Sequence, residues 1–293
     1  MTATIGYRRE MSTDPDEKNA PERSTASGYL HGYTEGERQR LRRQARFLEP
    51  MVHDRLPFRR RRRLIEVGSG VGAQTEILLR HFPELHVTGI ERNQEQLAEA
   101  ERFLAEVPWA AGRYRFTHGD AMRLTFERET FDAAFLCWIL EHVSDPARVL
   151  SEVRRVLAPG AAIVVNEVLN ATFFLSPYSP HTLRYWMAFN DRQLELGGDP
   201  FVGAKLGNLL LSVGFQQIET EVKTFHLDNR SPGERAEFLS YWTDLLLSGA
   251  PELERAGQVS AELVAGMTAE LDRVAHEPHS VFFYSFIQAR ART

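Results

Sequence analysis

This 293-residue sequence has only one cysteine, no long apolar run and no excess of basic charge. Its single cysteine, Cys137, excludes an intrachain disulfide and fits a reducing compartment. No apolar run approaches the roughly 20 residues that a membrane-spanning helix needs. The first residues also contain no apolar segment of the signal-peptide type. We therefore expect a cytoplasmic protein with no membrane partner.

The charge balance argues against a nucleic-acid partner, because the formal net charge is −5. The basic run from Arg59 to Arg63 is the exception. We interpret it as a solvated approach to a strand, with contacts to RNA phosphates as the alternative. No cluster with the spacing of metal ligands is evident, so no metal is expected. The fractions of apolar (43%) and charged (26%) residues are typical of a soluble globular protein.

The stretch 64–73 is the most informative part of the sequence. It is an apolar run that contains Glu66 and ends in the spacing Gly68-x-Gly70-x-x-Ala73. Glycines allow a tight turn that brings the backbone close to a ligand, and the N–H groups of a following helix can then face that ligand. Glu91 lies where an acidic residue would meet ribose hydroxyls. At this point a nicotinamide-dependent enzyme and a methyltransferase fit equally well.

Strand and helix patterns alternate from residue 63 to residue 168. This alternation predicts a parallel sheet that is covered on both faces, with ligands bound at the carboxyl ends of the strands. The expected strands are 63–67, 86–91, 114–118, 132–138 and 162–168, and the expected helices are 72–82, 94–106 and 146–157. Asp145 and Pro146 form a strong start signal for the last of these helices.

Three later motifs separate the two possibilities. They are His118-Gly119-Asp120-Ala121, the buried run 131–138 that continues into 139–146, and the turn 156–160 before another apolar run. In this order the series resembles the class I S-adenosylmethionine-dependent methyltransferases, in their small-molecule branch. The resemblance implies an α/β fold with a Rossmann-like, seven-stranded, mostly parallel sheet, helices on both faces and a helical substrate cap.

The resemblance also implies a cofactor site for S-adenosylmethionine, with S-adenosylhomocysteine as the product. Gly68, Ser69 and Gly70 would pack against the methionine part, Glu91 would accept from the ribose hydroxyls, and Asp120 would accept from the adenine amine. Alternatively, Asp120 is a turn residue and Glu91 caps a helix. Gln96 is either half of a capping pair with Asn93 or a cofactor contact. The full set of expected cofactor residues is Tyr29, Gln44, Glu66, Gly68, Ser69, Gly70, Glu91, Arg92, Gln96, Gly119, Asp120, Ala121 and Cys137.

The remaining sequence divides into four parts. We expect a disordered tail over 1–27, an N-terminal lid and helix over 28–62, the cofactor-binding core over 63–170, and cap insertions with the last two strands over 171–293. The helix of the second part is placed at 35–54. In the fourth part we expect helices at 199–213, from 231 onward and at 251–275, and strands at 215–226 and 280–287, the last of them antiparallel.

Methyl transfer needs alignment, exclusion of water and a base for a hydroxyl or protonated amine acceptor. His142 and His31 are the candidate bases, while Glu141 and Glu167 are weaker alternatives. Each histidine could instead have a packing role. The aromatic residues after 170 favour an apolar pocket, although each could simply fill the core of the cap. The expected substrate residues are Tyr33, Trp138, Phe174, Tyr178 and Trp186.

The sequence therefore predicts an S-adenosylmethionine-dependent methyltransferase that methylates oxygen or nitrogen of a small molecule. The alternatives are an NAD(P)-dependent oxidoreductase and a non-catalytic cofactor-binding protein of the same fold. The identity of the acceptor is not encoded in any recognisable motif, and a homodimer is left open.

Overall fold

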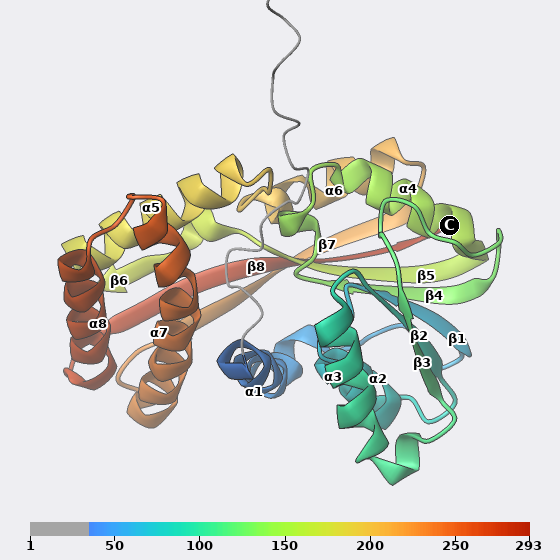
Figure 1. Ribbon diagram of the computed structural model, residues 1–293, viewed down its shortest axis with the longest axis horizontal. Coiled ribbons are helices and arrows are strands. Elements are labelled where there is room, and N and C mark those ends of the chain that lie inside the picture. The colour runs from blue at the N-terminus through green and yellow to red at the C-terminus, as the bar shows by residue number, and fades with distance from the viewer. Residues whose placement is uncertain (1–34) are drawn as a thin grey trace, which may run out of the picture.

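The computed structural model describes residues 35–293. Within this range an eight-stranded sheet runs through the molecule between two layers of helices (Figure 1). The strands are β1 (Arg63–Val67), β2 (His86–Glu91), β3 (Tyr114–His118), β4 (Phe131–Cys137), β5 (Leu157–Val168), β6 (Phe174–Ser176), β7 (Gln216–Leu227) and β8 (Val281–Arg292). The α-helices are α1 (Glu35–Val52), α2 (Ala73–His81), α3 (Gln94–Ala105), α4 (Pro146–Val156), α5 (Pro180–Glu195), α6 (Leu206–Ser212), α7 (Pro232–Arg255) and α8 (Ala261–His276).

The strand order is β3-β2-β1-β4-β5-β8, with β7 on the far side of β8. Strands β1 to β5 pair in parallel, whereas β8 is antiparallel to β5, β6 and β7. The prediction of a mostly parallel sheet with an antiparallel last strand is therefore confirmed. The short β6, which pairs with β8 beyond the end of β5, was not anticipated.

The apolar runs of the sequence form the centre of the sheet. Leu64 and Ile65 of β1 and Phe135 and Leu136 of β4 are fully buried, because these strands have neighbours on both edges and helices on both faces. The start signal of α4 is also confirmed, since the Asp145 carboxylate accepts a hydrogen bond from the backbone N–H of Arg148 at 2.8 Å.

Helices cover the sheet unequally (Figure 1). One face carries α4 and α6, and the opposite face carries α1, α2 and α3 beside the first strands. The helices α7 and α8 pack against each other and against α5, beyond the part of the sheet that β1 to β4 form. These three helices form the cap. None of the helices in residues 35–293 is long and apolar enough to cross a bilayer.

The cap differs from the prediction in two places. The expected helix over 199–213 begins instead as the 3₁₀ turn Val202–Lys205 and becomes α-helical only at Leu206. A Cβ on Gly203 would lie 2.5 Å from the Val168 carbonyl oxygen, so this turn presses its backbone against the end of β5. The helix expected from 231 is α7, which continues through Pro251 to Arg255, and the helix expected over 251–275 begins only at Ala261, as α8.

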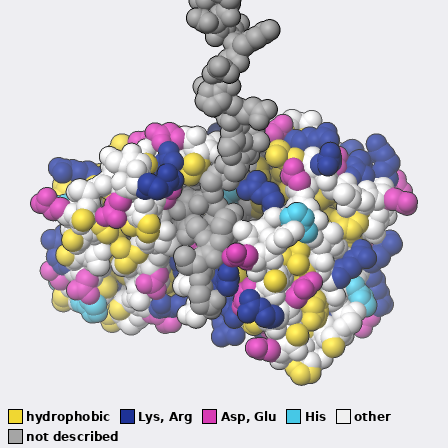
Figure 2. Space-filling view, viewed as in Figure 1, with side chains coloured by type: hydrophobic (Ala, Val, Ile, Leu, Met, Phe, Trp, Pro, Cys, Tyr) yellow, Lys and Arg dark blue, Asp and Glu magenta, His cyan; other side chains and the backbone are white. Residues whose placement is uncertain are grey.

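The surface mixes both signs of charge. On the face shown in Figure 2, acidic side chains lie among the lysines and arginines. Within the run Arg59 to Arg63, the Arg62 guanidinium pairs with Glu84, and Arg61 donates to the carbonyl oxygen of Gly160. Arg61 and Arg62 therefore have hydrogen-bond or ion-pair partners within the fold.

Candidate functional site

The glycine-rich turn lies between β1 and α2, at the carboxyl end of the sheet. Gly68, Gly70 and Gly72 all have positive φ, at 77°, 51° and 76°, which L-residues with a Cβ rarely adopt. A Cβ on Gly68 would also lie 2.8 Å from the Ile139 side chain. The Ser69 hydroxyl is buried and has no hydrogen-bond partner among residues 35–293. This turn therefore presents its backbone to the cavity that it lines.

Glu91 ends β2 directly beside this turn. One of its carboxylate oxygens accepts from the Gly70 backbone N–H at 3.0 Å and the other accepts from the Asn93 N–H at 2.8 Å. Each carboxylate oxygen can accept more than one hydrogen bond, so both keep a position for a ligand hydroxyl. The backbone contacts fix the carboxylate in place.

The Gln96 side chain lines the cavity and does not complete a capping pair with Asn93. Its backbone N–H does donate to the Asn93 side chain at 2.9 Å, so Asn93 caps α3. In a capping pair the Gln96 side chain would accept from the Asn93 N–H, but here that N–H donates to Glu91. The Gln96 side chain instead lies beside Gly70, where a Cβ on the glycine would be 3.4 Å from its oxygen, and it lines the cavity.

Asp120 follows β3 at the same edge of the sheet. One of its oxygens accepts from the Met122 N–H at 2.9 Å, which is the contact of a turn residue. Gly119, Asp120 and Ala121 all line the cavity. The turn contact and a ligand contact are compatible, since the second carboxylate oxygen remains.

Glu66 lies behind the cavity wall and does not line it. Its side chain is buried and accepts a hydrogen bond from the Thr75 hydroxyl of α2. Burial raises the pKa of Glu66 to about 8 against the effect of this hydrogen bond. Glu66 therefore fastens the glycine turn to α2.

A histidine and a glutamine that the motifs do not include complete this side of the cavity. The buried His53 ring lies 2.6 Å from the Gln74 side-chain oxygen, and Gln74 lines the cavity. Burial lowers the pKa of His53 to about 4, so the ring is neutral and donates to Gln74 at physiological pH. The sequence offers no signal for this pair, because Gln74 follows Ala73 at an ordinary helix start.

The chain turns sharply where β4 ends. Trp138 has a φ of 54°, unusual for a bulky residue, and its N–H donates to the Asn166 carbonyl oxygen at 2.9 Å. Strained backbone of this kind is concentrated at functional sites. The Trp138 ring meets the Phe286 ring edge to face at 5.8 Å, and both Cys137 and Trp138 line the cavity.

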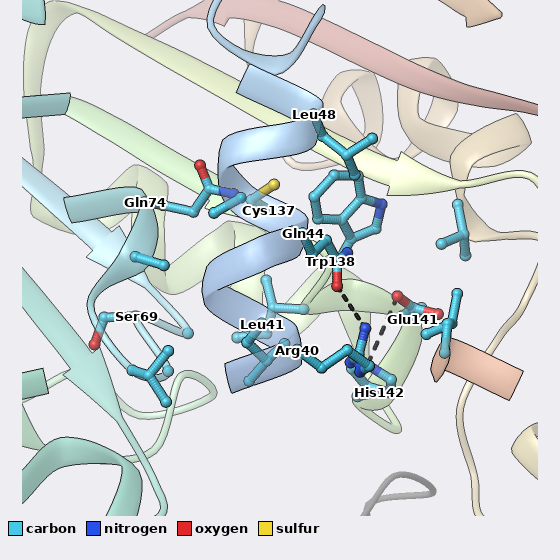
Figure 3. A pocket seen from close by; sticks show the side chains of 18 of the residues that line it. Arg40, Leu41, Gln44, Leu48, Ser69, Gln74, Cys137, Trp138, Glu141 and His142 are labelled. Atoms are coloured by element: carbon cyan, nitrogen blue, oxygen red, sulfur yellow. Dashed lines mark hydrogen bonds and ion pairs between the residues drawn. The ribbon is translucent and has the colours of Figure 1, made fainter. Parts of the chain in front are cut away.

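Glu141 and His142 meet just after this turn (Figure 3). The His142 Nε2 atom lies 3.6 Å from one carboxylate oxygen of Glu141, and the other oxygen accepts from the Gln193 amide of α5 at 2.7 Å. Behind them Glu167 accepts from the backbone N–H groups of Ile139 and Leu140. Burial and the nearby Glu141 raise the pKa of Glu167 well above its usual range, which favours its neutral form.

Helix α1 closes the opposite side. Figure 3 shows Arg40, Gln44 and Leu48 along this helix, near Trp138 and His142. The Arg40 guanidinium donates to Gln44 at 2.7 Å and makes two bonds to the buried Glu37. Gln44, predicted from the sequence, therefore does reach the cavity.

The cavity has a volume of about 320 Å³ and continues from the glycine turn into the cap. Its cap half is lined by an aromatic wall, which we define as the six residues Trp138, Trp186, Phe225, Phe238, Trp242 and Phe286. Only Trp138 and Trp186 of this wall were predicted as substrate residues. The others come from β7, β8 and α7, whose positions beside the cavity depend on the sheet order.

The remaining predicted residues are not brought to the cavity. Phe174 and Tyr178 are 56% and 74% exposed and point away from the core. Tyr29, His31 and Tyr33 lie outside the described residues. One cavity is therefore lined by most of the residues predicted to bind the cofactor, while its cap half has a different set of aromatics from the predicted substrate residues.

The sequence of this chain is similar to those of known proteins. The family model described as "Methyltransferase domain" matches residues 65–165. The O-methyltransferase rstn1 of Aspergillus nomiae is 30% identical over 172 residues, which are 57% of this chain and 70% of that protein. The chain belongs to the class I S-adenosylmethionine-dependent methyltransferases. The nicotinamide alternative is thereby set aside.

A second relative is similar in sequence, and two solved structures are similar in fold. The O-methyltransferase cnsE of Penicillium expansum is 31% identical over 53% of this chain and 52% of its own length. The chain thus spans about half the length of that relative. Among solved structures, the YcgJ protein of Bacillus subtilis matches with a TM-score of 0.54 at 15% identity, over 85% of this chain and 98% of its own. The cyclase SpnF matches with a TM-score of 0.50 at 23% identity, over 85% and 80%. These two likenesses concern the fold alone.

Proposed function

We propose that this protein transfers a methyl group from S-adenosylmethionine to a small molecule, at a hydroxyl oxygen. The main support is one continuous cavity that joins the glycine turn, Glu91 and Asp120 to the aromatic wall. The named activities of rstn1 and cnsE, both O-methyltransferases, support oxygen as the acceptor atom.

The residues at the turn fit the cofactor. The Ser69 hydroxyl is buried without a partner in the described chain, and Gly68 leaves no room for a Cβ. Glu91 is held by two backbone N–H groups and retains acceptor positions for two ribose hydroxyls. Gln74 and Gln96 supply further polar atoms on either side.

When bound, the cofactor supplies a methyl group on a positively charged sulfur. The methyl passes to the acceptor oxygen, the electrons of the broken carbon–sulfur bond stay on sulfur, and the hydroxyl proton must leave. His142 takes that proton in our proposal, since an imidazole ionises in the physiological range. Glu141 stabilises the resulting imidazolium from 3.6 Å, and α1 and the cap exclude water.

Titration calorimetry with S-adenosylhomocysteine tests the cofactor assignment. We expect micromolar binding by the wild type and a weakening of roughly 10- to 100-fold in Glu91→Ala, because a lost hydrogen bond at a buried partner costs about 1–3 kcal/mol. The matched control is Glu101→Ala, at an exposed position of the helix α3 that follows Glu91. Absence of binding by the wild type would refute the proposal. Binding without turnover on any hydroxylated acceptor would instead favour a non-catalytic protein of this fold.

The remaining assignments stay predictions. They are the cytoplasmic location, the absence of a nucleic-acid partner, the homodimer, and the division into a core over 63–170 and a cap region over 171–293.

A further inference from the structure

The aromatic wall is continuous from the end of β4 to the cap. Trp138 contacts Phe286 at 5.8 Å between ring centroids, Phe286 contacts Phe225 at 6.1 Å, and Phe225 contacts Phe238 at 4.7 Å. Phe238 then meets Trp242 at 6.0 Å, and Trp242 meets Trp186 at 5.6 Å. A ligand that reaches from the cofactor half into the cap therefore touches rings along its whole length.

The polar atoms beside this wall are bonded to one another rather than to the cavity. The Trp186 indole N–H donates to the Asn170 carbonyl oxygen at 3.0 Å, and the Tyr284 hydroxyl donates to the Asn170 side-chain oxygen at 2.9 Å. The Asn170 amide in turn donates to Asn190 at 2.7 Å. A charged ligand would lose its hydration here without gaining a compensating polar partner.

Several ring faces of the aromatic wall are covered by neighbouring rings. Trp242 stacks against Phe173 at an interplanar angle of 12° and against Phe238 at 21°, and Trp186 stacks against Phe189 at 10°. Aromatic faces are negative and aromatic edges are positive. Because stacked neighbours take up these faces, the wall is poorly suited to a cation and well suited to edge-to-face contacts with another ring.

One hydrogen-bond donor of the aromatic wall is left unbonded by the described residues. The Trp242 indole N–H is buried and has no partner among residues 35–293. Because this N–H is itself buried, it gives a ligand in the cavity no polar partner. Arg40, Glu141 and His142 line the same cavity, and the Arg40 guanidinium is already bonded to Glu37 and Gln44.

We infer that the methyl acceptor is a neutral, flat aromatic compound, whose ring system packs against the aromatic wall and whose hydroxyl lies at Glu141 and His142. This inference rests on the proposed function and names its substrate class. In the reaction, the hydroxyl oxygen forms the new bond to the methyl carbon and its proton passes to His142. The carbon–sulfur bond breaks with both electrons left on sulfur.

Three probes with the same ring system and different charges test the inference on protein saturated with S-adenosylhomocysteine. They are 2-naphthol, naphthalene-2-sulfonate and 2-naphthyltrimethylammonium. Three of the four tryptophans line the cavity, so quenching of tryptophan fluorescence reports binding. We expect 2-naphthol to bind at least about tenfold more tightly than either ion, because burying a charge without a partner is costly.

Two variants locate the binding. Trp186→Ala and Phe225→Leu should each weaken 2-naphthol roughly tenfold or more while S-adenosylhomocysteine still binds, which shows that the core is folded. Phe225→Leu preserves an apolar side chain in case the cap does not tolerate Trp186→Ala. The matched control is Trp109→Ala, since Trp109 is 47% exposed and outside the cavity.

Three results would overturn the inference: tighter binding of the ammonium probe, equal binding of all three, or no binding of any probe to the loaded protein. Unchanged 2-naphthol affinity in both wall variants would overturn it as well. If the protein fails to bind S-adenosylhomocysteine at all, the proposed function itself fails, and the two failures are thereby distinguished.

Discussion

Glu66 and Glu91 show how two carboxyl groups beside the same turn take opposite roles. Glu91 is partly exposed and receives two backbone N–H groups, so its charge is supported and available to a ligand. Glu66 is buried beside Thr75 and its pKa is raised to about 8. The first is placed to bind, and the second to hold the turn in place.

Glu66→Gln should therefore change the pH dependence of stability. The pKa of Glu66 is about 8 in the folded protein against an ordinary 4.5, so folding favours the protonated form. Its contribution is fully present below about pH 4.5 and is lost as pH rises toward 8. Relative to the always neutral variant, the wild type should lose on the order of 3 kcal/mol between pH 5 and pH 8.

Urea denaturation of both proteins across this pH range measures the difference. A constant difference between wild type and variant at all pH values would show that Glu66 does not carry a raised pKa in the folded state.

His142→Ala should lower turnover by roughly 10²- to 10⁴-fold, the usual contribution of a general base. Cofactor affinity should change little, because the contacts of Glu91 and the glycine turn remain. Steady-state kinetics with a hydroxylated acceptor, together with calorimetry, separate the two effects. His276→Ala on α8 is the control, since that histidine is largely exposed. Wild-type turnover in His142→Ala would leave His142 with a packing role only.

At the scale of elements, the cap helix α5 is tied directly to the residue before the candidate base. The Gln193 amide binds the Glu141 carboxylate, and the Asp199 N–H donates to the Glu141 carbonyl oxygen at 2.9 Å. Gly198 lies between them, where a Cβ would be 2.3 Å from that same oxygen. The same helix supplies Trp186 to the aromatic wall, so acceptor binding and the position of Glu141 share one element.

Gly198→Ala should push this turn away from Glu141. We expect turnover to fall about tenfold or more while S-adenosylhomocysteine affinity stays within about twofold, because a 1 Å misplacement near the chemistry is costly. The control is Gly233→Ala, where a Cβ meets open space and a helix gains about 0.5–1 kcal/mol. Equal loss of turnover in both variants would contradict the coupling of α5 to Glu141.

The elements also show where sequence reasoning succeeds. Strands β1 to β5 were placed within a few residues, except for the earlier start of β5, because each is an apolar run bounded by turn residues. The cofactor half of the site followed from them, since parallel strands bring their carboxyl ends to one edge. The aromatic wall could not be derived in this way, because Phe225, Trp242 and Phe286 meet only after the strand order is known. The expectation of a new helix at Pro251 was wrong for a related reason. The buried Leu246 and Leu253 pack on either side of this proline and keep α7 continuous across it.

At the scale of the whole molecule, the cavity lies between the core and the cap, so a bound ligand contacts both. S-adenosylhomocysteine at 100 times its dissociation constant should stabilise the folded state by about 2.7 kcal/mol. For a chain of this size that corresponds to a rise in melting temperature of roughly 4–5 °C. Differential scanning fluorimetry measures it, with Glu91→Ala as the control. An unchanged melting temperature in the wild type would contradict ligand binding to the folded state.

The place of β8 has a consequence for how the chain is made. This strand lies between β5 and β6 on one side and β7 on the other, yet it is the last strand to be synthesised. Until it emerges from the ribosome, one edge of β5 and the whole of β7 have no partner, and Phe225, Phe238 and Trp242 have no Phe282 or Phe286 to pack against. Until β8 is made, the nascent chain therefore carries unpaired strand edges and exposed aromatics, which are the features that attract chaperones.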